Sequence, residues 1–175
     1  MKHCGKTHHG ASLAATLGRA FVDLDSLIQE IDAEGGDSRR PVREIYRNDG
    51  EERFRQLEAE ACRRVASEQR DLVVATGGGI CDNEAALETI SGGVCVYVSD
   101  TLSRLTERVL ASGIPAFLET EDLAEARDRF ARMYRRRTAI YSRIATVTVK
   151  VDRLGLDEAE RRVVASVKEF LDGGQ

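Results

Sequence analysis

Two short and almost wholly apolar runs limit the fold of this chain more than any other feature. They are DLVVAT at residues 71–76 and VCVYVS at residues 94–99. Each run has the length of a strand, and apolar side chains at nearly every position indicate burial on both faces. Strands of this kind belong to parallel sheets that helices cover on both sides, so the runs predict an α/β fold.

Helical patterns alternate with these runs and with two further strands, RAFVDLD at 19–25 and TVTVKV at 146–151. The helical patterns cover residues 5–18, 25–33, 41–49, 50–70, 101–110, 123–145 and 156–171. This alternation predicts a single three-layer domain over residues 1–175, with a parallel sheet flanked by helices. In such a sheet, functional sites form at the carboxyl ends of the strands.

The composition excludes several classes of partner. A formal net charge of −4 argues against binding nucleic acid by bulk electrostatic attraction. No apolar run approaches the roughly 20 residues that a membrane span needs, and the N-terminus lacks the layout of a signal peptide. The four cysteines lie far apart without metal-ligand spacing, as is typical of reduced thiols in the cytoplasm. We therefore expect a cytoplasmic chain that binds neither membranes nor nucleic acid.

The tripeptide Gly5-Lys6-Thr7 opens the first helical pattern. A helix N-terminus offers unpaired N–H groups and a positive dipole end, which together bind phosphate oxygens. Lys6 would reach the β- and γ-phosphates of a nucleotide, and the Thr7 hydroxyl would coordinate Mg²⁺. The adjacent His8 and His9 point in different directions on a helix, so they cannot share a metal ion.

Two acids follow the strand at 19–25, in the sequence FVDLD. Asp23 and Asp25 are expected to project toward the same region at the end of this strand. Near a phosphate loop, Asp23 could hold Mg²⁺ through water, and Asp25 could accept a hydrogen bond or a proton from a substrate hydroxyl. The alternative is that Asp25 only caps the helix that follows.

The sequence GEERFRQLE places Phe54, Arg55 and Glu58 within one helical turn. One interpretation of Arg55 and Glu58 is a surface ion pair of little energetic value. The other is an arginine that its glutamate partner aims at a substrate carboxylate.

The three glycines Gly77, Gly78 and Gly79 end the run at 71–76 and indicate either a tight turn or a close approach of backbone to a ligand. A cluster of arginines lies further along the chain, in the helical pattern at 123–145. Most of these arginines should be solvated, and spacing alone cannot choose which of them turns inward. The cluster is Arg132, Arg135, Arg136, Arg137 and Arg143.

Taken together, these segments resemble shikimate kinases, which are small P-loop kinases of the nucleoside-monophosphate-kinase type. The resemblance covers nearly the whole chain, because GKTHHGASLAATLG, FVDLDSLIQE, GEERFRQLE, ATGGGI, VCVYVS, RRTAIYSRIA and TVTVKVD occur in the family's order. It implies a cytoplasmic, monomeric enzyme in which ATP, with Mg²⁺, phosphorylates the 3-hydroxyl of shikimate on the pathway to chorismate and the aromatic amino acids.

The resemblance also assigns roles to residues. Lys6 resembles the phosphate-binding lysine and Thr7 the Mg²⁺ ligand, with Gly5 and His8 beside them at the nucleotide and Asp23 beside the metal. Asp25 resembles the residue that binds the shikimate hydroxyls and acts as the base. The residues that resemble the rest of the shikimate site are Arg55 and Arg137 on the carboxylate, Glu58 and Phe54 beside Arg55, and the backbone of Gly77, Gly78 and Gly79.

Three departures from the family pattern stand out. The family's first strand and first loop glycine would precede Met1. We therefore expect that the start of the sequence is assigned too far downstream. We also expect a sheet without its central strand, in which the two neighbouring strands keep unpaired backbone groups. His3 stands where the family usually has glycine. In the lid, at about 110–122, the family's Arg-Pro pair is replaced by Ile114-Pro115. Arg108 falls near the position where the family stacks an arginine on adenine.

Two other functions remain open at this point. The same fold and paired arginines would suit a kinase for another small hydroxy acid, such as gluconate. The lid without its arginine and the absent strand would instead suit a catalytically weakened relative that binds nucleotide or acid and serves regulation. The loss of the arginine matters because a phosphate-binding arginine can contribute on the order of 10³-fold in rate.

Overall fold

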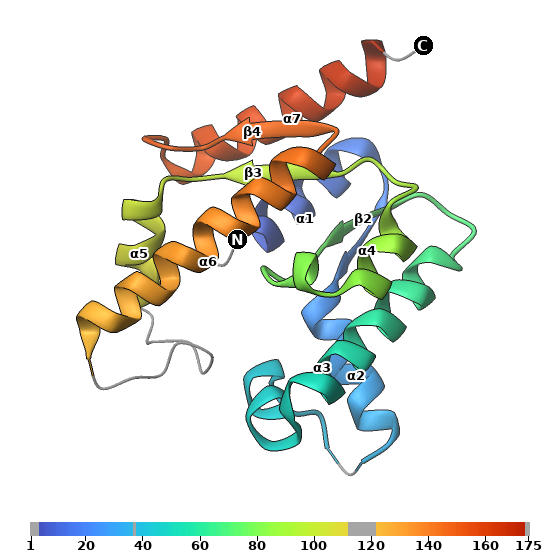
Figure 1. The fold of residues 1–175 in the computed structure, drawn as a ribbon. Coiled ribbons are helices and arrows are strands. Elements are labelled where there is room, and N and C mark those ends of the chain that lie inside the picture. The colour runs from blue at the N-terminus through green and yellow to red at the C-terminus, as the bar shows by residue number, and fades with distance from the viewer. Residues whose placement is uncertain (1–3, 37, 112–121, 174–175) are drawn as a thin grey trace.

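A computed structural model describes residues 4–36, 38–111 and 122–173 of the chain (Figure 1). Strands and helices alternate along these residues as the sequence predicts. The helical elements are α1 (Lys6–Leu17), α2 (Leu24–Glu34), α3 (Val42–Ala66), a short 3₁₀ turn η1 (Ile80–Asp82), α4 (Glu84–Ile90), α5 (Leu102–Ala111), α6 (Leu123–Ile144) and α7 (Leu156–Gly173). The strands are β1 (Ala20–Asp23), β2 (Leu72–Ala75), β3 (Val96–Ser99) and β4 (Val147–Lys150).

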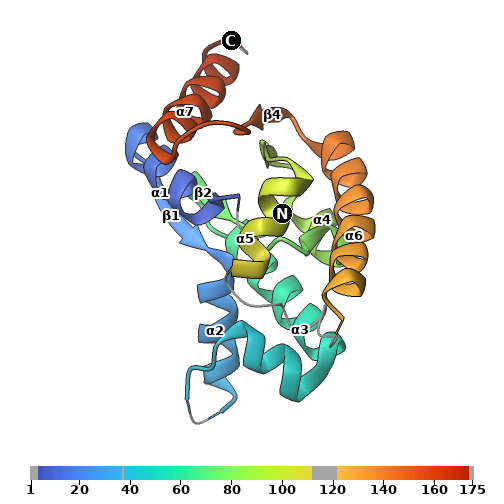
Figure 2. The same cartoon turned by 90° about the vertical axis from the view of Figure 1, so that its left-hand side faces the viewer.

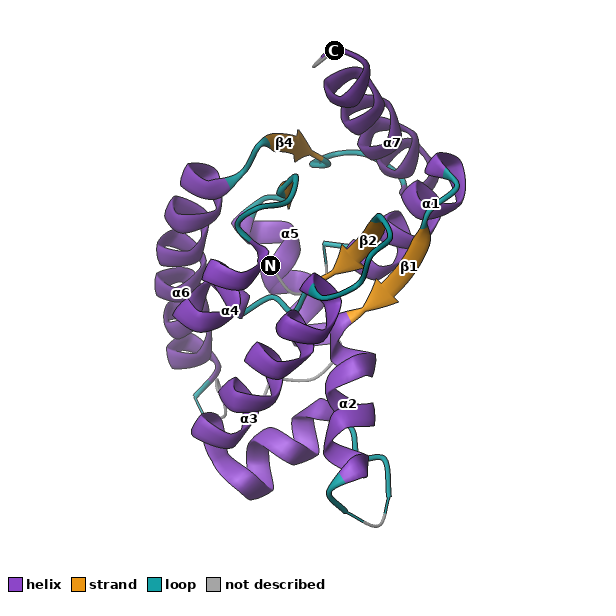
Figure 3. Cartoon of the chain, turned by 90° about the vertical axis from the view of Figure 1, so that its right-hand side faces the viewer, coloured by secondary structure: helices purple, strands orange, loops and turns teal. Residues whose placement is uncertain are grey.

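The four described strands form two separate parallel pairs. β1 runs beside β2, with Asp23 opposite Ala75, and β3 runs beside β4, with Ser99 opposite Lys150. Figures 1 and 3 show the two pairs apart from each other. The parallel pairing confirms the predicted fold class. Within the described residues, no strand pairing joins the two sheets.

Helices α1 and α7 connect the two sheets. α1 packs on β1 and β2, and α7 packs on both α1 and β4. A continuous core joins the elements. It includes Leu24 and Ile28 of α2, Ile45 of α3, Leu105 of α5 and Phe130 of α6, each at most 2% exposed. The core therefore extends from α2 and α3 to α5 and α6.

A glycine bends α3 and orients its first part. The backbone of Gly50 has φ 85° and ψ 174°, which is strained for any residue with a side chain. The two helices predicted at 41–49 and 50–70 thus form one element with a kink. Arg40, just before α3, pairs with Asp32 of α2 and with Asp49 at the kink. These contacts fix the first part of α3 against α2, at the lower end of the view in Figure 2.

Buried thiols contribute to the core. Cys4, Cys62 and Cys81 are each less than a tenth exposed, and burial raises the pKa of the Cys62 thiol to about 12. These cysteines therefore act as small core residues, as the sequence indicates. None of the helices in the described residues has the length and apolar character of a membrane span.

Candidate active site

A pocket of about 810 Å³ lies between the start of α1, the ends of β1 and β2, the kinked α3 and the middle of α6. Every site residue predicted from the sequence except Arg108 lines this pocket. The predicted residues that line it are Gly5, Lys6, Thr7, His8, Asp23, Asp25, Phe54, Arg55, Glu58, Gly77, Gly78, Gly79 and Arg137. The predicted residues are thus brought together in one place, as expected for the carboxyl ends of parallel strands.

The start of α1 forms one end of the pocket. Gly5 caps the helix in the left-handed conformation (φ 79°), and a Cβ at this position would lie 2.7 Å from Nε2 of His9, so only glycine fits. The Thr7 hydroxyl donates a hydrogen bond of 2.7 Å to Oδ2 of Asp23. The helix N-terminus, a lysine and two hard oxygen ligands are therefore adjacent, which is the donor set that a magnesium–phosphate group requires.

Asp25 lies in the first turn of α2 and not in the strand. β1 ends at Asp23, and the Asp23 side chain caps α2 by accepting a hydrogen bond of 3.1 Å from the Ser26 amide. The alternative in which Asp25 is the cap is therefore wrong. A Cβ on Gly77 would lie 3.2 Å from Oδ1 of Asp25. The absence of a side chain at Gly77 lets the carboxylate approach the glycine run closely.

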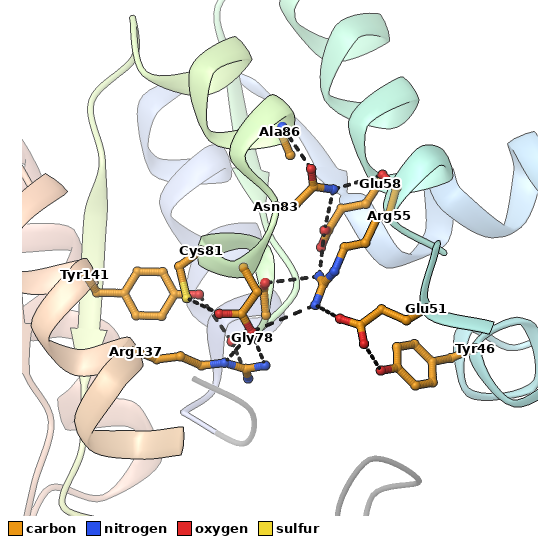
Figure 4. Close-up of polar contacts among 12 residues, drawn as sticks. Tyr46, Glu51, Arg55, Glu58, Gly78, Cys81, Asn83, Ala86, Arg137 and Tyr141 are labelled. Atoms are coloured by element: carbon orange, nitrogen blue, oxygen red, sulfur yellow. Dashed lines mark hydrogen bonds and ion pairs between the residues drawn. The ribbon is translucent and has the colours of Figure 1, made fainter. Parts of the chain in front are cut away.

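Arg55 and Glu58 form a buried pair in the second part of α3. Nη1 of Arg55 donates to Oε2 of Glu58 at 3.0 Å and to the carbonyl of Gly79 at 3.2 Å. The Glu58 side chain is 1% exposed, so the interpretation as a surface ion pair is wrong. Nδ2 of Asn83 also donates to Glu58, at 2.9 Å, while Oδ1 of Asn83 caps α4 (Figure 4). Arg55 is thus held in a single orientation by the glycine loop and α4.

Among the five clustered arginines, only Arg137 is buried, with 10% of its side chain exposed. Nη1 of Arg137 donates to the carbonyl of Gly78 at 2.9 Å, and the Tyr141 hydroxyl donates to the same carbonyl at 3.2 Å. A Cβ on Gly79 would lie 3.0 Å from Nη2 of Arg137. The glycine run therefore brings its backbone against two arginines, as Figure 4 shows for Gly78, Arg55 and Arg137.

Aromatic residues of α3 form an apolar wall beside Arg55. The rings of Tyr46 and Phe54 meet edge to face with 5.7 Å between their centroids. The Tyr46 hydroxyl donates to Glu51 at 3.1 Å, and Glu51 accepts from Arg55 at 3.3 Å. Burial raises the pKa of Tyr46, so its hydroxyl keeps its proton at neutral pH. The two rings thus give the pocket an apolar side next to Arg55.

Arg108 lies outside this lining. Its Nη1 is 3.1 Å from Oδ2 of the fully buried Asp100, and Nε of Arg104 is 3.6 Å from Oδ1 of the same carboxylate. Both arginines belong to α5. The predicted contact of Arg108 with adenine stays a prediction. Most of the predicted lid, including Ile114-Pro115, lies outside the described residues.

Several residues in or beside the pocket were not among the site residues predicted from the sequence. Asp82, Asn83, Glu51 and Arg136 contact the two inward arginines or their partners. Asn83 could have been found as a helix cap, because it directly precedes the helical pattern EAALETI. The contacts of Asp82 carry no local signal, because their partners lie 27, 54 and 55 residues away in the sequence.

His9 lies buried behind the phosphate loop. The side chain is 3% exposed, and Nδ1 has no hydrogen-bond partner in the described part of the chain. Burial lowers the pKa of His9 below its ordinary value of 6.5, and the neighbouring His8 lowers it further. Unfolding exposes His9 and restores its ordinary pKa, so the unfolded chain binds more protons as the pH falls through 6.5.

We therefore expect the melting temperature to fall as the pH is lowered from 7.5 to 5.5, because folded His9 resists protonation in this range. The variant His9→Asn should show a smaller fall in melting temperature over the same pH range. Thermal unfolding followed by circular dichroism at several pH values measures both slopes. Equal slopes for the two proteins would show that His9 does not cause the pH dependence.

Parallel strands with covering helices, a Gly-Lys-Thr helix start and an adjacent pair of acids define a P-loop kinase that acts on a small molecule. The comparisons with known proteins agree. The family model for shikimate kinase matches residues 2–171, so the chain belongs to the shikimate kinase family. This finding confirms the resemblance that the sequence motifs indicate.

Individual relatives give the same result. A shikimate kinase of Mycobacterium avium is 29% identical over 161 residues, which cover 92% of this chain and 86% of the relative. A shikimate kinase of Synechococcus elongatus is 35% identical over 136 residues, which cover 73% and 68% of the two chains.

Solved structures confirm the fold. A shikimate kinase from Acinetobacter baumannii, in complex with shikimate, has a TM-score of 0.80 at 24% identity, covering 98% of this chain and 89% of that one. A shikimate kinase from Bacteroides thetaiotaomicron has a TM-score of 0.80 at 25% identity, with 98% and 94% covered. The arrangement of the described elements is therefore that of a shikimate kinase.

Proposed function

We propose that this chain transfers the γ-phosphoryl group of ATP to the 3-hydroxyl of shikimate and releases ADP and shikimate 3-phosphate. The observation that carries the proposal is the convergence of Arg55 and Arg137 on the glycine run, next to Asp25 and in the same pocket as Lys6. A substrate with a carboxylate at one end and a hydroxyl at the other would span from the arginines to the phosphate loop.

The two ends of the pocket would have separate tasks. The N-terminus of α1 and Lys6 would bind the transferring phosphates, which carry most of the developing negative charge. Arg55 and Arg137 would bind the substrate carboxylate through charge-assisted hydrogen bonds. Because Glu58, Asn83 and the Gly79 carbonyl already fix Arg55, little ordering of this side chain would remain to be done on binding.

Asp25 would hold the hydroxyl that attacks. Its carboxylate lies within contact distance of the Gly77 position, beside the glycine run that ends at the arginines. A carboxylate at this position can accept the hydrogen bond of the hydroxyl and then its proton as the new P–O bond forms. The attacking oxygen would thus be oriented toward the phosphate loop.

Thr7 and Asp23 are the residues that would hold Mg²⁺, because their oxygens lie 2.7 Å apart next to the phosphate-binding helix. The ion would neutralise charge on the β- and γ-phosphate oxygens. We further propose a single domain over residues 1–175 with a lid at about 110–122. A monomeric state and a cytoplasmic location are part of the same proposal.

The test is an assay of ADP release from Mg-ATP with shikimate, with gluconate and with no acceptor. We expect ADP release that depends on shikimate, and a product whose mass corresponds to one added phosphoryl group. Removal of Mg²⁺ by a chelator should abolish the reaction. A preference for gluconate would favour the other acid kinase, and release that no acceptor stimulates would contradict an acid kinase altogether.

A further inference from the structure

Three arginines of the pocket share one carboxylate, that of Asp82. Nε and Nη2 of Arg137 donate to Oδ2 of Asp82 at 3.0 and 2.7 Å, and Nη2 of Arg136 donates to Oδ1 at 2.7 Å. Nη2 of Arg55 lies 3.8 Å from Oδ2. The Asp82 side chain is 10% exposed. A buried carboxylate of the protein thus lies at the point where the arginines converge.

The contact with Arg137 uses the part of the guanidinium that binds carboxylates best. The Nε and Nη2 donors form one edge of the planar fork, and this edge matches a carboxylate group. Nη1 of Arg137 is engaged with the carbonyl of Gly78 at 2.9 Å. A carboxylate that arrives in the pocket would therefore find this edge of Arg137 already occupied.

The charges around this point balance before any substrate binds. Arg55, Arg136 and Arg137 face the three carboxylates of Glu51, Glu58 and Asp82. Glu51 and Glu58 pair with Arg55, whereas Asp82 contacts all three arginines. An acidic substrate therefore enters a site with little net attraction, in contrast to a bare pair of arginines.

The carboxylate of Asp82 does not cap the helix that follows it. The helix cap of α4 is provided by the next residue, Asn83. The Asp82 side chain accepts hydrogen bonds from Arg136, from Arg137 and, at 3.6 Å, from the thiol of Cys81. The side chain therefore acts mainly on the two arginines of α6.

We propose that Asp82 is a specificity-determining residue, an internal carboxylate that competes with the acid group of the substrate for Arg137 and Arg55. A substrate carboxylate gains the arginines only by displacing Asp82 or sharing them with it. A simple carboxylate gains too little binding free energy from this exchange to bind well. An acid whose hydroxyls also contact Asp25 and the glycine run gains enough additional binding free energy to compete with Asp82. The inference rests on the proposed function, because it takes the substrate to be a hydroxylated acid.

The test is calorimetric binding of shikimate without nucleotide to the unchanged protein and to Asp82→Asn. Asparagine has nearly the same shape and keeps an oxygen acceptor for the arginines, but it has no charge. We expect the Kd for shikimate to fall about tenfold in the variant, a size typical of one charge pair. Binding of benzoate, a carboxylate without hydroxyls, should become measurable, and the Kd for the uncharged methyl ester of shikimate should stay the same.

Asp172→Asn is the matched control, because it removes the same charge at an exposed position near the end of α7, outside the pocket. Asp82→Ser provides a second variant if Asp82→Asn does not fold, as judged by thermal unfolding. Weaker binding of shikimate in a folded Asp82 variant would overturn the inference and make Asp82 a residue that positions Arg137. An unchanged Kd for shikimate would overturn the inference about Asp82 but would leave the proposed function standing. Absence of shikimate binding to every protein, the unchanged one included, would overturn the proposed function as well.

Discussion

Replacement of Asp25 by asparagine should lower kcat for shikimate phosphorylation by about 10²–10⁴-fold, the usual contribution of a positioned general base. Asparagine can still bind a hydroxyl at the same place, so the KM for shikimate should change much less than kcat. The fold should survive, because the cap of α2 comes from Asp23 and not from Asp25. Steady-state kinetics with varied shikimate at saturating Mg-ATP separates the two parameters.

Asp157→Asn is a suitable control for this variant. Asp157 lies exposed in the first turn of α7, a place in its helix similar to that of Asp25 in α2, but far from the pocket lining. We expect the kinetics of the control to match those of the unchanged protein. A kcat for Asp25→Asn within a few-fold of the unchanged value would exclude Asp25 as the base and limit its role to substrate binding.

Replacement of Arg137 by lysine should raise the KM for shikimate by about 10²-fold, with a smaller effect on kcat. Lysine keeps the charge but loses the planar fork, so it cannot hold the Gly78 carbonyl and offer a second edge to the substrate carboxylate at the same time. Truncating one partner of a buried, hydrogen-bonded charge pair costs about 2–5 kcal/mol, and a loss near the lower limit corresponds to this change in KM.

Arg135→Lys makes the same chemical change two residues earlier on α6, at an exposed position outside the pocket lining. Its KM for shikimate should equal that of the unchanged protein. Thermal unfolding of both variants shows whether the loss of affinity comes from the site or from the fold. A KM for Arg137→Lys that matches the control would remove Arg137 from the carboxylate site.

Much of the fold could be predicted from local patterns. The apolar runs at 71–76 and 94–99 became β2 and β3, because side chains that are apolar on both faces have few other stable environments. The end of α1 at Gly18 and the kink at Gly50 fall where glycine permits a positive φ. The end of β1 was predicted at residue 25, two residues too late. The alternating acids in FVDLD are typical of a strand, but the Asp23 side chain caps α2, so the helix already begins at Leu24.

Part of the site could be predicted only as a set of alternatives. The spacing of Arg55 and Glu58 is the same for a surface ion pair and for a buried one, because spacing does not reveal burial. Burial follows from the packing of α3 against α4 and the glycine loop. In the same way, spacing could not select Arg137 among five arginines. The resemblance to shikimate kinases selected it, and the structure places it in the pocket.

The sequence by itself determined the parallel α/β fold, the phosphate loop at Gly5–Thr7 and the acids and glycines that surround it. These features depend on hydrophobic periodicity, on glycine at special backbone angles and on residues close together in the chain. Only the tertiary structure decided that Asp82 lies among Arg55, Arg136 and Arg137. The reason is physical: the charge that an arginine faces depends on which distant segments pack against it, and a linear pattern does not contain that packing.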